Sequence, residues 1–256
     1  DLLTLTGDYA ILPPLPAIGG GEGVGRVEEL GSDVQNLTVG QMVLLPVGIG
    51  TWRTHLVVAA AKLMSLPNEA DPQQLAMITV NPPTAALMLS EFVALQKGDW
   101  VIQNAANSGV GTYLAQLAKI RGFKTVNIVR RESAVALVQE NGGDIILVDG
   151  DKLSERVAEA TGGAKIKLGV DAVGGESTRR LASCLCEEAT LVSYGAMSGE
   201  SYSLSPSDMI FKDISFKGFW LAKWFKQTSQ QEQMALFSEL TELIASGKIY
   251  SNIQAT

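Results

Sequence analysis

Apolar and polar positions change their spacing partway along the chain. From about Pro82 onward, short apolar runs alternate with stretches that have the spacing of helices. The apolar runs are DWVIQNA, FKTVNIVRR, DIILVD, LGVDAVGG, ATLVSYG and ISFKGFWL, and the helical stretches are GTYLAQLAKIRG, SAVALVQENGG, KLSERVAEATGG and STRRLASCLC. Strands that alternate with helices in this way predict a parallel sheet covered on both faces.

The part of the chain before Pro82 has a different pattern. Glycines and prolines interrupt short apolar runs such as GRVEELG and MVLLPVG, which predicts a β-rich segment with many turns. Near the C-terminus, SQQEQMALFSELTELIASGK predicts an amphipathic helix that ends at Gly247. The pattern therefore predicts an α/β chain, with a doubly wound parallel sheet and a separate β-rich part.

Composition narrows the classes of function. The chain has 256 residues, of which 46% are hydrophobic, enough for one large core or two smaller ones. No apolar run approaches the ~20 residues of a membrane-spanning helix, and no segment has the pattern of a secretory leader. The formal net charge of −7 disfavours nucleic acid and anionic membranes as partners. We therefore expect no membrane insertion, and any anionic ligand needs a local basic site.

Residues that bind transition metals are scarce in this sequence. Cys184 and Cys186 are its only cysteines, and His55 is its only histidine. Two cysteines so close together form neither a disulfide framework nor a four-ligand zinc site. We therefore expect no metal.

The stretch NAANSGVG, residues 104–111, raises the first chemical question. It follows the first strand of the alternating region and opens its first helix, which is the place of a dinucleotide-binding turn. The glycine fingerprint is incomplete, because Ala105 and Ser108 stand where glycines are expected. Gly109 and Gly111 still permit close approach of the backbone, and a helix N-terminus suits a pyrophosphate. An ordinary glycine turn is the alternative interpretation.

Arg130 and Arg131 follow roughly twenty residues after this turn, where an NAD-binding protein has an acidic residue for the ribose hydroxyl. Two guanidinium groups at this place suit a ribose 2′-phosphate. A solvated pair of arginines at a strand end is the other interpretation. We interpret the pair as an indication of NADPH.

Several segments occur in a fixed order across nearly the whole chain. They are GDYAILPPLPAIGGGEGVGRVEELGS, GTWRT, VNPPTA, VIQNAANSGVG, VNIVRR, VDAVGG, YGAM and IFKDISFKGFWL. In this order they resemble the medium-chain dehydrogenase/reductase superfamily, and within it the zinc-independent mitochondrial-type 2-enoyl thioester reductases. The resemblance implies a Rossmann domain inserted in a GroES-like catalytic domain. It also implies that NADPH reduces a trans-2-enoyl-CoA or an enoyl-acyl-carrier thioester.

The resemblance also implies a division of the chain. Residues 1–82 would form the GroES-like catalytic domain, residues 83–221 the Rossmann domain, and residues 222–256 a return towards the catalytic domain. The family has more β-structure before the segment that matches Asp1, and a later C-terminal segment with a cofactor-contacting lysine. We therefore expect the sequence to be incomplete at both ends. The expected location is the cytoplasm of a bacterium or the mitochondrial matrix of a eukaryote.

Cofactor contacts follow from the resemblance, position by position. They are Asn81, the turn residues Asn107, Ser108, Gly109 and Val110, Arg130 and Arg131 at the 2′-phosphate, Tyr194, Gly195, Ala196 and Met197 beside the nicotinamide, and Phe219, Trp220 and Leu221 from the strand at the edge of the active site. Some relatives have Asp in place of Arg131, so only Arg130 carries over cleanly. Structural roles stay open for Asn81 as a helix cap, for the segment 194–197 as a strand end, and for Trp220 as a core or interface aromatic.

Tyr9, in the stretch TGDYAILPPLP, is the catalytic residue that the resemblance implies. A phenol stays protonated at neutral pH and can donate its proton to a developing carbanion. Three prolines, Pro13, Pro14 and Pro16, would stiffen the loop that carries it. On the residues alone, a simple amphipathic loop residue is the better interpretation of Tyr9, and the resemblance reverses that preference.

Three functions fit these observations. The resemblance favours an enoyl thioester reductase of fatty acid synthesis, whose substrate is carried on coenzyme A or on acyl carrier protein. A quinone or small-enone reductase on the same scaffold is the second, and a non-catalytic NADPH-binding protein is the third. The resemblance further implies a homodimer that pairs the last Rossmann strand, Ile214 to Trp220, with its symmetry mate.

Overall fold

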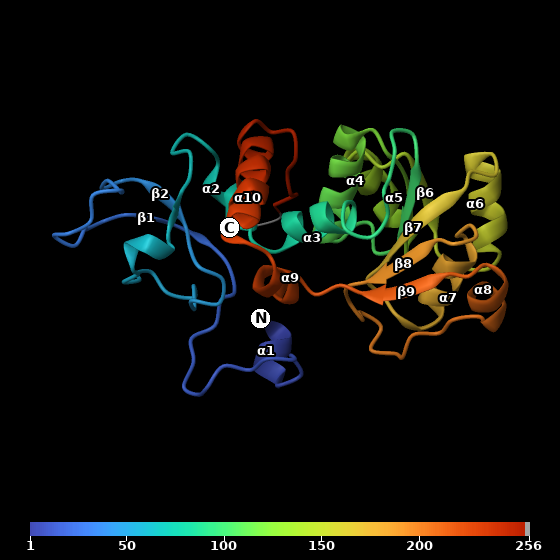
Figure 1. Ribbon diagram of the computed structural model, residues 1–256, viewed down its shortest axis with the longest axis horizontal. Helices are drawn as coiled ribbons and strands as arrows, with labels where there is room; N and C mark the ends of the chain where they lie inside the picture. The colour runs from blue at the N-terminus through green and yellow to red at the C-terminus, as the bar shows by residue number, and fades with distance from the viewer. Residues whose placement is uncertain (254–256) are drawn as a thin grey trace. The chain divides into compact units, whose positions relative to one another are not determined.

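The computed structural model describes residues 1–253, which fall into two compact units (Figure 1). Unit 1 comprises Asp1–Val80 and the segment that begins at Met234, and unit 2 comprises Asn81–Gln233. Within the described residues, the helices lack the combination of length and apolarity that crossing a membrane requires.

Unit 2 is built on a six-stranded parallel sheet. Its strands are β4 (Trp100–Gln103), β5 (Lys124–Val129), β6 (Ile145–Val148), β7 (Ile166–Asp171), β8 (Thr190–Ser193) and β9 (Ser215–Gly218). They pair in the order β6-β5-β4-β7-β8-β9, and every pair is parallel. This is the doubly wound order of a dinucleotide-binding fold, so the predicted sheet is confirmed. The winding reverses between β4 and β7, and ligands of such sheets bind at the carboxyl ends of the strands there.

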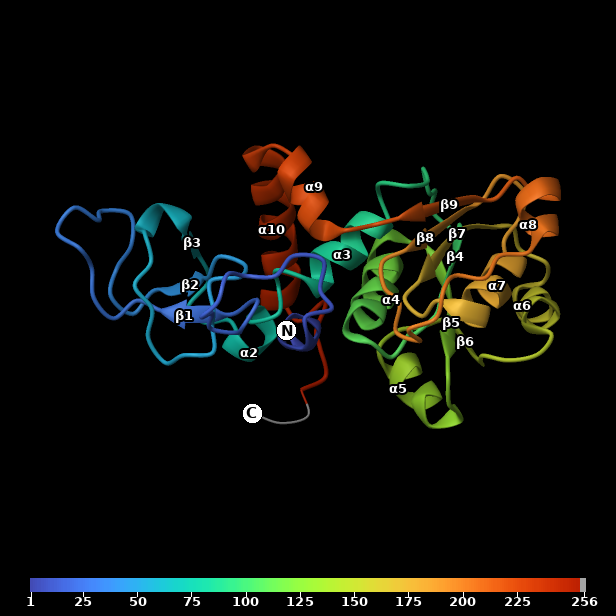
Figure 2. The same ribbon diagram turned by 90° about the horizontal axis from the view of Figure 1, so that it is seen from below.

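Helices cover both faces of this sheet (Figure 2). One face carries α4 (Gly109–Arg121) and α5 (Val135–Glu140), and the other carries α6 (Leu153–Thr161) and α7 (Gly175–Ser183). The remaining elements of unit 2 are α3 (Asn81–Met88), the short 3-10 helix η2 (Glu132–Ala134), α8 (Pro206–Phe211) and α9 (Leu221–Gln227). Helix α3 packs on α4, and the Arg121 guanidinium donates to the Ala86 carbonyl at 2.9 Å.

Helix α4 is buried along most of its length. It begins because the Ser108 side chain accepts a hydrogen bond from the Gly111 N–H, and it ends because Gly122 adopts a left-handed conformation. Every residue from Val110 to Ala118 is buried. The helix is therefore fixed against the sheet over more than two turns, with its N-terminus at the carboxyl end of β4.

Unit 1 contains a three-stranded antiparallel sheet of short strands. These are β1 (Val24–Arg26), β2 (Met42–Leu44) and β3 (Met64–Ser65), in the order β1-β2-β3. The unit also holds α1 (Leu2–Thr6), the 3-10 helix η1 (Ala60–Lys62), α2 (Pro72–Leu75) and most of α10 (Gln230–Ala245). The separate β-rich part is confirmed, although long loops rather than strands make up most of it.

Candidate active site

The turn between β4 and α4 keeps its shape although two glycines of the fingerprint are missing. Ala105 has a φ of +47°, in the left-handed region that usually selects glycine. Ser108 replaces the other expected glycine, and its hydroxyl caps α4 by accepting from the Gly111 N–H at 3.1 Å. Both departures therefore fit a dinucleotide-type turn without changing its course.

The two remaining glycines of the turn are closely surrounded by other atoms. A Cβ on Gly111 would lie 2.6 Å from the Ala106 carbonyl oxygen and 2.8 Å from that of Ala105. A Cβ on Gly109 would lie 2.6 Å from Asn81 Nδ2. Glycine at both positions thus lets the helix start sit tightly on the turn and beside Asn81. The first N–H groups of a helix have no partner within it and can bind a pyrophosphate.

Tyr194 joins this turn from the end of β8. A hydrogen bond links its side chain to that of Ser108, and burial, aided by the nearby Asp171 carboxylate, raises the pKa of Tyr194 to about 12. The phenol is therefore protonated at neutral pH. The structure thus brings together four residues that the sequence assigned to the cofactor, namely Asn81, Ser108, Gly109 and Tyr194.

The segment that starts at Tyr194 follows the turn after β7. Backbone N–H groups of residues 194, 197 and 198 donate to the carbonyls of residues 171, 172 and 173 at 3.0, 3.0 and 2.9 Å. A Cβ on Gly195 would lie 3.1 Å from the Ala172 carbonyl oxygen, so the two segments are in close contact. Ala196 and Met197 are exposed. Residues 194–197 therefore lie at the carboxyl end of the sheet, beside the switch point.

The other turn residues and the arginines are placed as follows. Asn107 is exposed at the tip of the turn, whereas Val110 is buried in the first turn of α4. Arg130 and Arg131 directly follow β5, and both are exposed. Since β5 is parallel to β4 and lies next to it in the sheet, Arg130 and Arg131 lie at the same edge of the sheet as the turn after β4.

The strand expected to carry Phe219, Trp220 and Leu221 is shorter than predicted. β9 ends at Gly218, and Leu221 already begins α9. The Phe219 N–H still donates to the Ser193 carbonyl at 2.8 Å, and its ring packs edge-on against Phe92 at 5.9 Å. These three residues therefore lie just beyond the strand end, where the chain turns from sheet to helix.

Tyr9 belongs to unit 1. Its N–H donates to the Leu3 carbonyl at 3.0 Å, directly after α1, and its side chain is 42% exposed.

Metal-binding side chains do not gather in the part of the chain that the structure describes, where no group of three or more His, Cys, Asp or Glu could hold an ion. His55 Nε2 lies 3.1 Å from Glu28 Oε2 on the surface. The absence of zinc stays a prediction.

Glu22 is a partly buried acidic residue of unit 1. Its carboxylate accepts a hydrogen bond from the Thr79 hydroxyl at 2.8 Å, and burial raises the pKa of this carboxyl.

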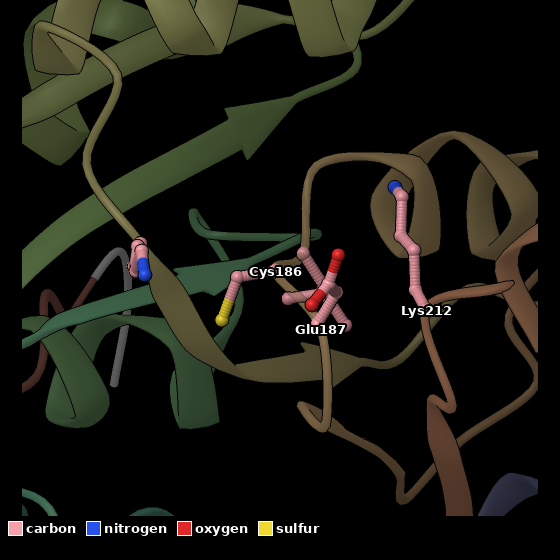
Figure 3. A pocket seen from close by; sticks show the side chains of 5 residues that line it. Cys186, Glu187 and Lys212 are labelled. Carbon is pink, nitrogen blue, oxygen red and sulfur yellow. The ribbon is translucent and has the colours of Figure 1, made fainter.

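A separate hollow of about 370 Å³ lies in unit 2 (Figure 3). It is lined by Lys165, Leu185, Cys186, Glu187 and Lys212. The Cys186 N–H donates to the carbonyl of Ile166, the first residue of β7, so the hollow is at the amino end of the sheet. Because ligands of doubly wound sheets bind at the opposite end, this hollow is not the candidate site.

Two buried polar residues at the sheet's carboxyl edge are not among the predicted site residues. Asn104 directly follows β4, Asp171 is the last residue of β7, and the Asn104 amide donates to the Asp171 carboxylate at 2.6 Å. Asp171 directly follows the apolar run 168–170, and Asn104 follows the apolar run 100–102 after one polar residue, Gln103. That position is the signal that would have found them, since buried polar groups need partners.

Comparisons with known proteins agree with this geometry. The family model of the alcohol dehydrogenase GroES-like domain matches residues 1–68, and that of the zinc-binding dehydrogenase matches residues 109–239. The mitochondrial enoyl-acyl-carrier-protein reductase of Dictyostelium discoideum is 37% identical over 257 residues, covering 95% of this chain and 72% of that protein.

Solved structures agree as well. The Etr1p complex with NADP and crotonyl-CoA matches with a TM-score of 0.92 and 27% identity, covering 100% of this chain and 79% of the other. The Etr1p/Etr2p heterodimer of Candida tropicalis, a mitochondrial 2-enoyl thioester reductase, gives 0.91 and 28% with coverages of 100% and 79%. Escherichia coli quinone oxidoreductase with NADPH gives 0.84 and 26%, with coverages of 99% and 78%. The chain therefore belongs to the medium-chain dehydrogenase/reductase superfamily, in the group of the mitochondrial-type enoyl thioester reductases.

Proposed function

We propose that this protein uses NADPH to reduce the C2–C3 double bond of trans-2-enoyl thioesters, as a step of fatty acid synthesis. The observation that carries the proposal is the start of α4, where a Cβ on Gly109 or Gly111 would lie 2.6 Å from a neighbouring atom and where Asn81 and Tyr194 meet the turn. A relative that is 37% identical over most of the chain is named for this activity.

The residues at the carboxyl edge of the unit 2 sheet fit NADPH. The N–H groups at the start of α4 would hold its pyrophosphate, and Arg130 and Arg131 would hold the 2′-phosphate. Residues 194–197 and 219–221 would line the nicotinamide half. When bound, NADPH supplies a hydride to the β-carbon of the enoyl group.

Two tyrosines have different tasks in this proposal. Tyr9 holds a proton on an exposed phenol and donates it to the α-carbon of the substrate. Tyr194 keeps its own proton, because its pKa is about 12, and its hydrogen bond with Ser108 holds the end of β8 on the turn. The first is a catalytic residue and the second a binding residue.

We assign the catalytic, GroES-like role to unit 1 and the coenzyme-binding role to unit 2. The family model of the GroES-like domain, which matches residues 1–68, supports the first assignment. The sequence predicts boundaries after residues 82 and 221, with residues 222–256 as the return towards the catalytic domain, whereas the compact units divide after Val80 and after Gln233. Residues 254–256 lie outside the described part of the chain.

Partners and location complete the proposal. The substrate is a small thioester of coenzyme A or of an acyl carrier protein, and the protein acts as a homodimer. The Etr1p/Etr2p heterodimer supports pairing of such chains. The relatives are named mitochondrial, which supports the mitochondrial matrix in a eukaryote, and the cytoplasm would be the corresponding place in a bacterium.

A quinone reductase is the second candidate, because the chain also matches the quinone oxidoreductase of Escherichia coli with NADPH. The loss of NADPH absorbance, followed with crotonyl-CoA, with a longer enoyl-CoA and with a quinone, separates the possibilities. We expect rapid oxidation with the enoyl thioesters and slow oxidation with the quinone. The reverse order would establish the quinone reductase, and tight NADPH binding without oxidation by any of them would indicate a non-catalytic protein.

A further inference from the structure

We propose that Asn104 and Asp171 are positioning residues for the coenzyme. Together they fix the turn after β4, residues 104–108, to the turn after β7, residues 171–174. The inference rests on the proposed function, because these two turns are the ones that would surround the coenzyme. It adds two residues, neither of which would touch the coenzyme itself.

The Asp171 carboxylate lies fully inside the protein and is saturated with hydrogen bonds. It is 0% exposed. Its Oδ1 accepts from Asn104 Nδ2 at 2.6 Å and from the N–H groups of Val173 and Gly174 at 3.0 and 3.3 Å. Its Oδ2 accepts from the Thr178 hydroxyl at 2.7 Å. Such a group holds the backbone of the turn after β7 in one conformation.

Asn104 bonds to this turn twice. Its Nδ2 donates to Asp171, and its Oδ1 accepts from the N–H of Ala172 at 2.8 Å. Asn104 is itself only 2% exposed, and it directly precedes Ala105, the residue with the left-handed backbone. These two hydrogen bonds, called the clamp below, fix Asn104, the first residue of the turn after β4, to the turn after β7.

The clamp extends to the segment expected at the nicotinamide. The carbonyls of Ala172 and Val173 accept from the N–H groups of Met197 and Ser198 at 3.0 and 2.9 Å. A shift of residues 171–174 would therefore carry the segment 194–198 with it. The pair Asn104–Asp171 thus sets the distance between the place of the pyrophosphate and the place of the nicotinamide.

Location argues that this polar pair has more than a packing role. Burying a carboxylate is costly, and an apolar pair of similar size would fill the same space. This one lies at the switch point between β4 and β7, at the carboxyl ends of both strands. Directional hydrogen bonds hold two ligand-binding segments at a defined distance, whereas apolar packing fixes that distance less precisely.

The test compares three variants by NADPH fluorescence titration and by thermal unfolding. Asn104→Ala removes the clamp and should raise the Kd for NADPH about tenfold, which corresponds to about 1.4 kcal/mol. Asp171→Asn should stay within about threefold of wild type. Its Oδ1 still accepts the same N–H donors, and its amide can donate to the Thr178 hydroxyl, which rotates to accept. This rescue by a conservative change would show that geometry, not charge, is required.

The matched control is Thr125→Val, on the neighbouring strand β5. The Thr125 hydroxyl is buried and bonds to the Asp144 carboxylate and to Asn127 at 3.1 and 2.9 Å, but it contacts neither turn. We expect this variant to lose thermal stability and to bind NADPH within twofold of wild type, near the limit of ordinary titration. A purely structural role of Asn104 would make the two variants alike.

The possible outcomes distinguish a failure of the proposed function from a failure of the inference about Asn104 and Asp171. If wild-type protein does not bind NADPH, the proposed function fails. If wild type binds and folded Asn104→Ala binds equally well, the clamp has no role in positioning. If Asn104→Ala does not fold, Asn104→Ser replaces it, because a serine hydroxyl cannot reach both partners. The same loss of affinity is then expected, and wild-type affinity would overturn the inference.

Discussion

Replacing Gly111 by alanine adds one carbon where two backbone oxygens already stand. The new Cβ would lie 2.6 and 2.8 Å from the carbonyl oxygens of Ala106 and Ala105, whereas carbon–oxygen contacts need about 3.3 Å. Both oxygens belong to the backbone of the turn, so the turn and α4 must separate by about 0.5–0.7 Å. Overpacking costs about 1–3 kcal/mol, and alanine gains up to ~1 kcal/mol over glycine in a helix. We expect a net loss of about 1–2 kcal/mol.

Gly109→Ala on the same turn is the matched control. Its Cβ would meet Asn81 Nδ2 at 2.6 Å, which is the end of a side chain that can rotate away. Stability should therefore change little, whereas NADPH loses a binding residue. Thermal unfolding should show Gly111→Ala lower than wild type by about 2–8 °C and Gly109→Ala close to wild type. The KM for NADPH should rise in both variants.

This pair of variants can refute the reasoning in two ways. Wild-type thermal stability of Gly111→Ala would mean that α4 does not pack on the turn as closely as the structure indicates. Unchanged KM for NADPH in both variants would mean that the coenzyme does not bind at the start of α4.

Four further predictions follow from the site and its surroundings. Replacing Arg130 and Arg131 by alanine should raise the KM for NADPH at least tenfold and leave that for NADH nearly unchanged, because charge-assisted bonds to phosphate contribute ~1.5–3 kcal/mol each; equal use of both coenzymes by wild type would contradict this. Tyr9→Phe should lower kcat ~10²–10⁴-fold without weakening NADPH binding, and near-normal turnover of crotonyl-CoA would exclude Tyr9 as the proton donor. Burial raises the pKa of Glu22 in the folded protein, so its stabilising contribution is present in acid and is lost as the pH rises through that pKa. Glu22→Gln, which keeps a hydrogen bond to Thr79, should therefore gain free energy of unfolding relative to wild type from mildly acidic to neutral buffer, and a difference that does not depend on pH in urea unfolding would contradict it. Light scattering at micromolar concentration should show a dimer, and a stable monomer would argue against pairing through β9.

The strands and helices of unit 2 were predictable because the spacing of their apolar residues shows which positions are buried. Val101 and Ile102 are neighbours in β4, so their side chains point to opposite faces of the sheet, and both are apolar and buried. Apolar residues in succession are typical of strands covered on both faces. The end of β9 was not predictable in the same way. Phe219 and Trp220 favour a strand by their side chains, but the backbone turns into α9 at Leu221. Side-chain preference does not encode where tertiary packing redirects the chain.

The contacts that assemble the site depend on long-range folding. Asn104 and Asp171 are 67 positions apart, and no local spacing indicates that their side chains meet. The left-handed backbone of Ala105 is equally hidden, because alanine does not by itself favour a positive φ. Family resemblance predicted the turn and its cofactor residues, whereas the contact between Asn104 and Asp171 beneath them became visible only with the sheet order.

The exposure of Arg130 and Arg131 has an evolutionary consequence. Both side chains stand in solvent after the last residue of β5, and the hydrogen bonds that hold the carboxyl edge together run through other residues. Substitutions at these two positions can therefore accumulate without a loss of folding stability. In the proposed function these two arginines select NADPH, so the preference between two coenzymes would be free to drift in descendants of this protein while the scaffold beneath them stays under constraint.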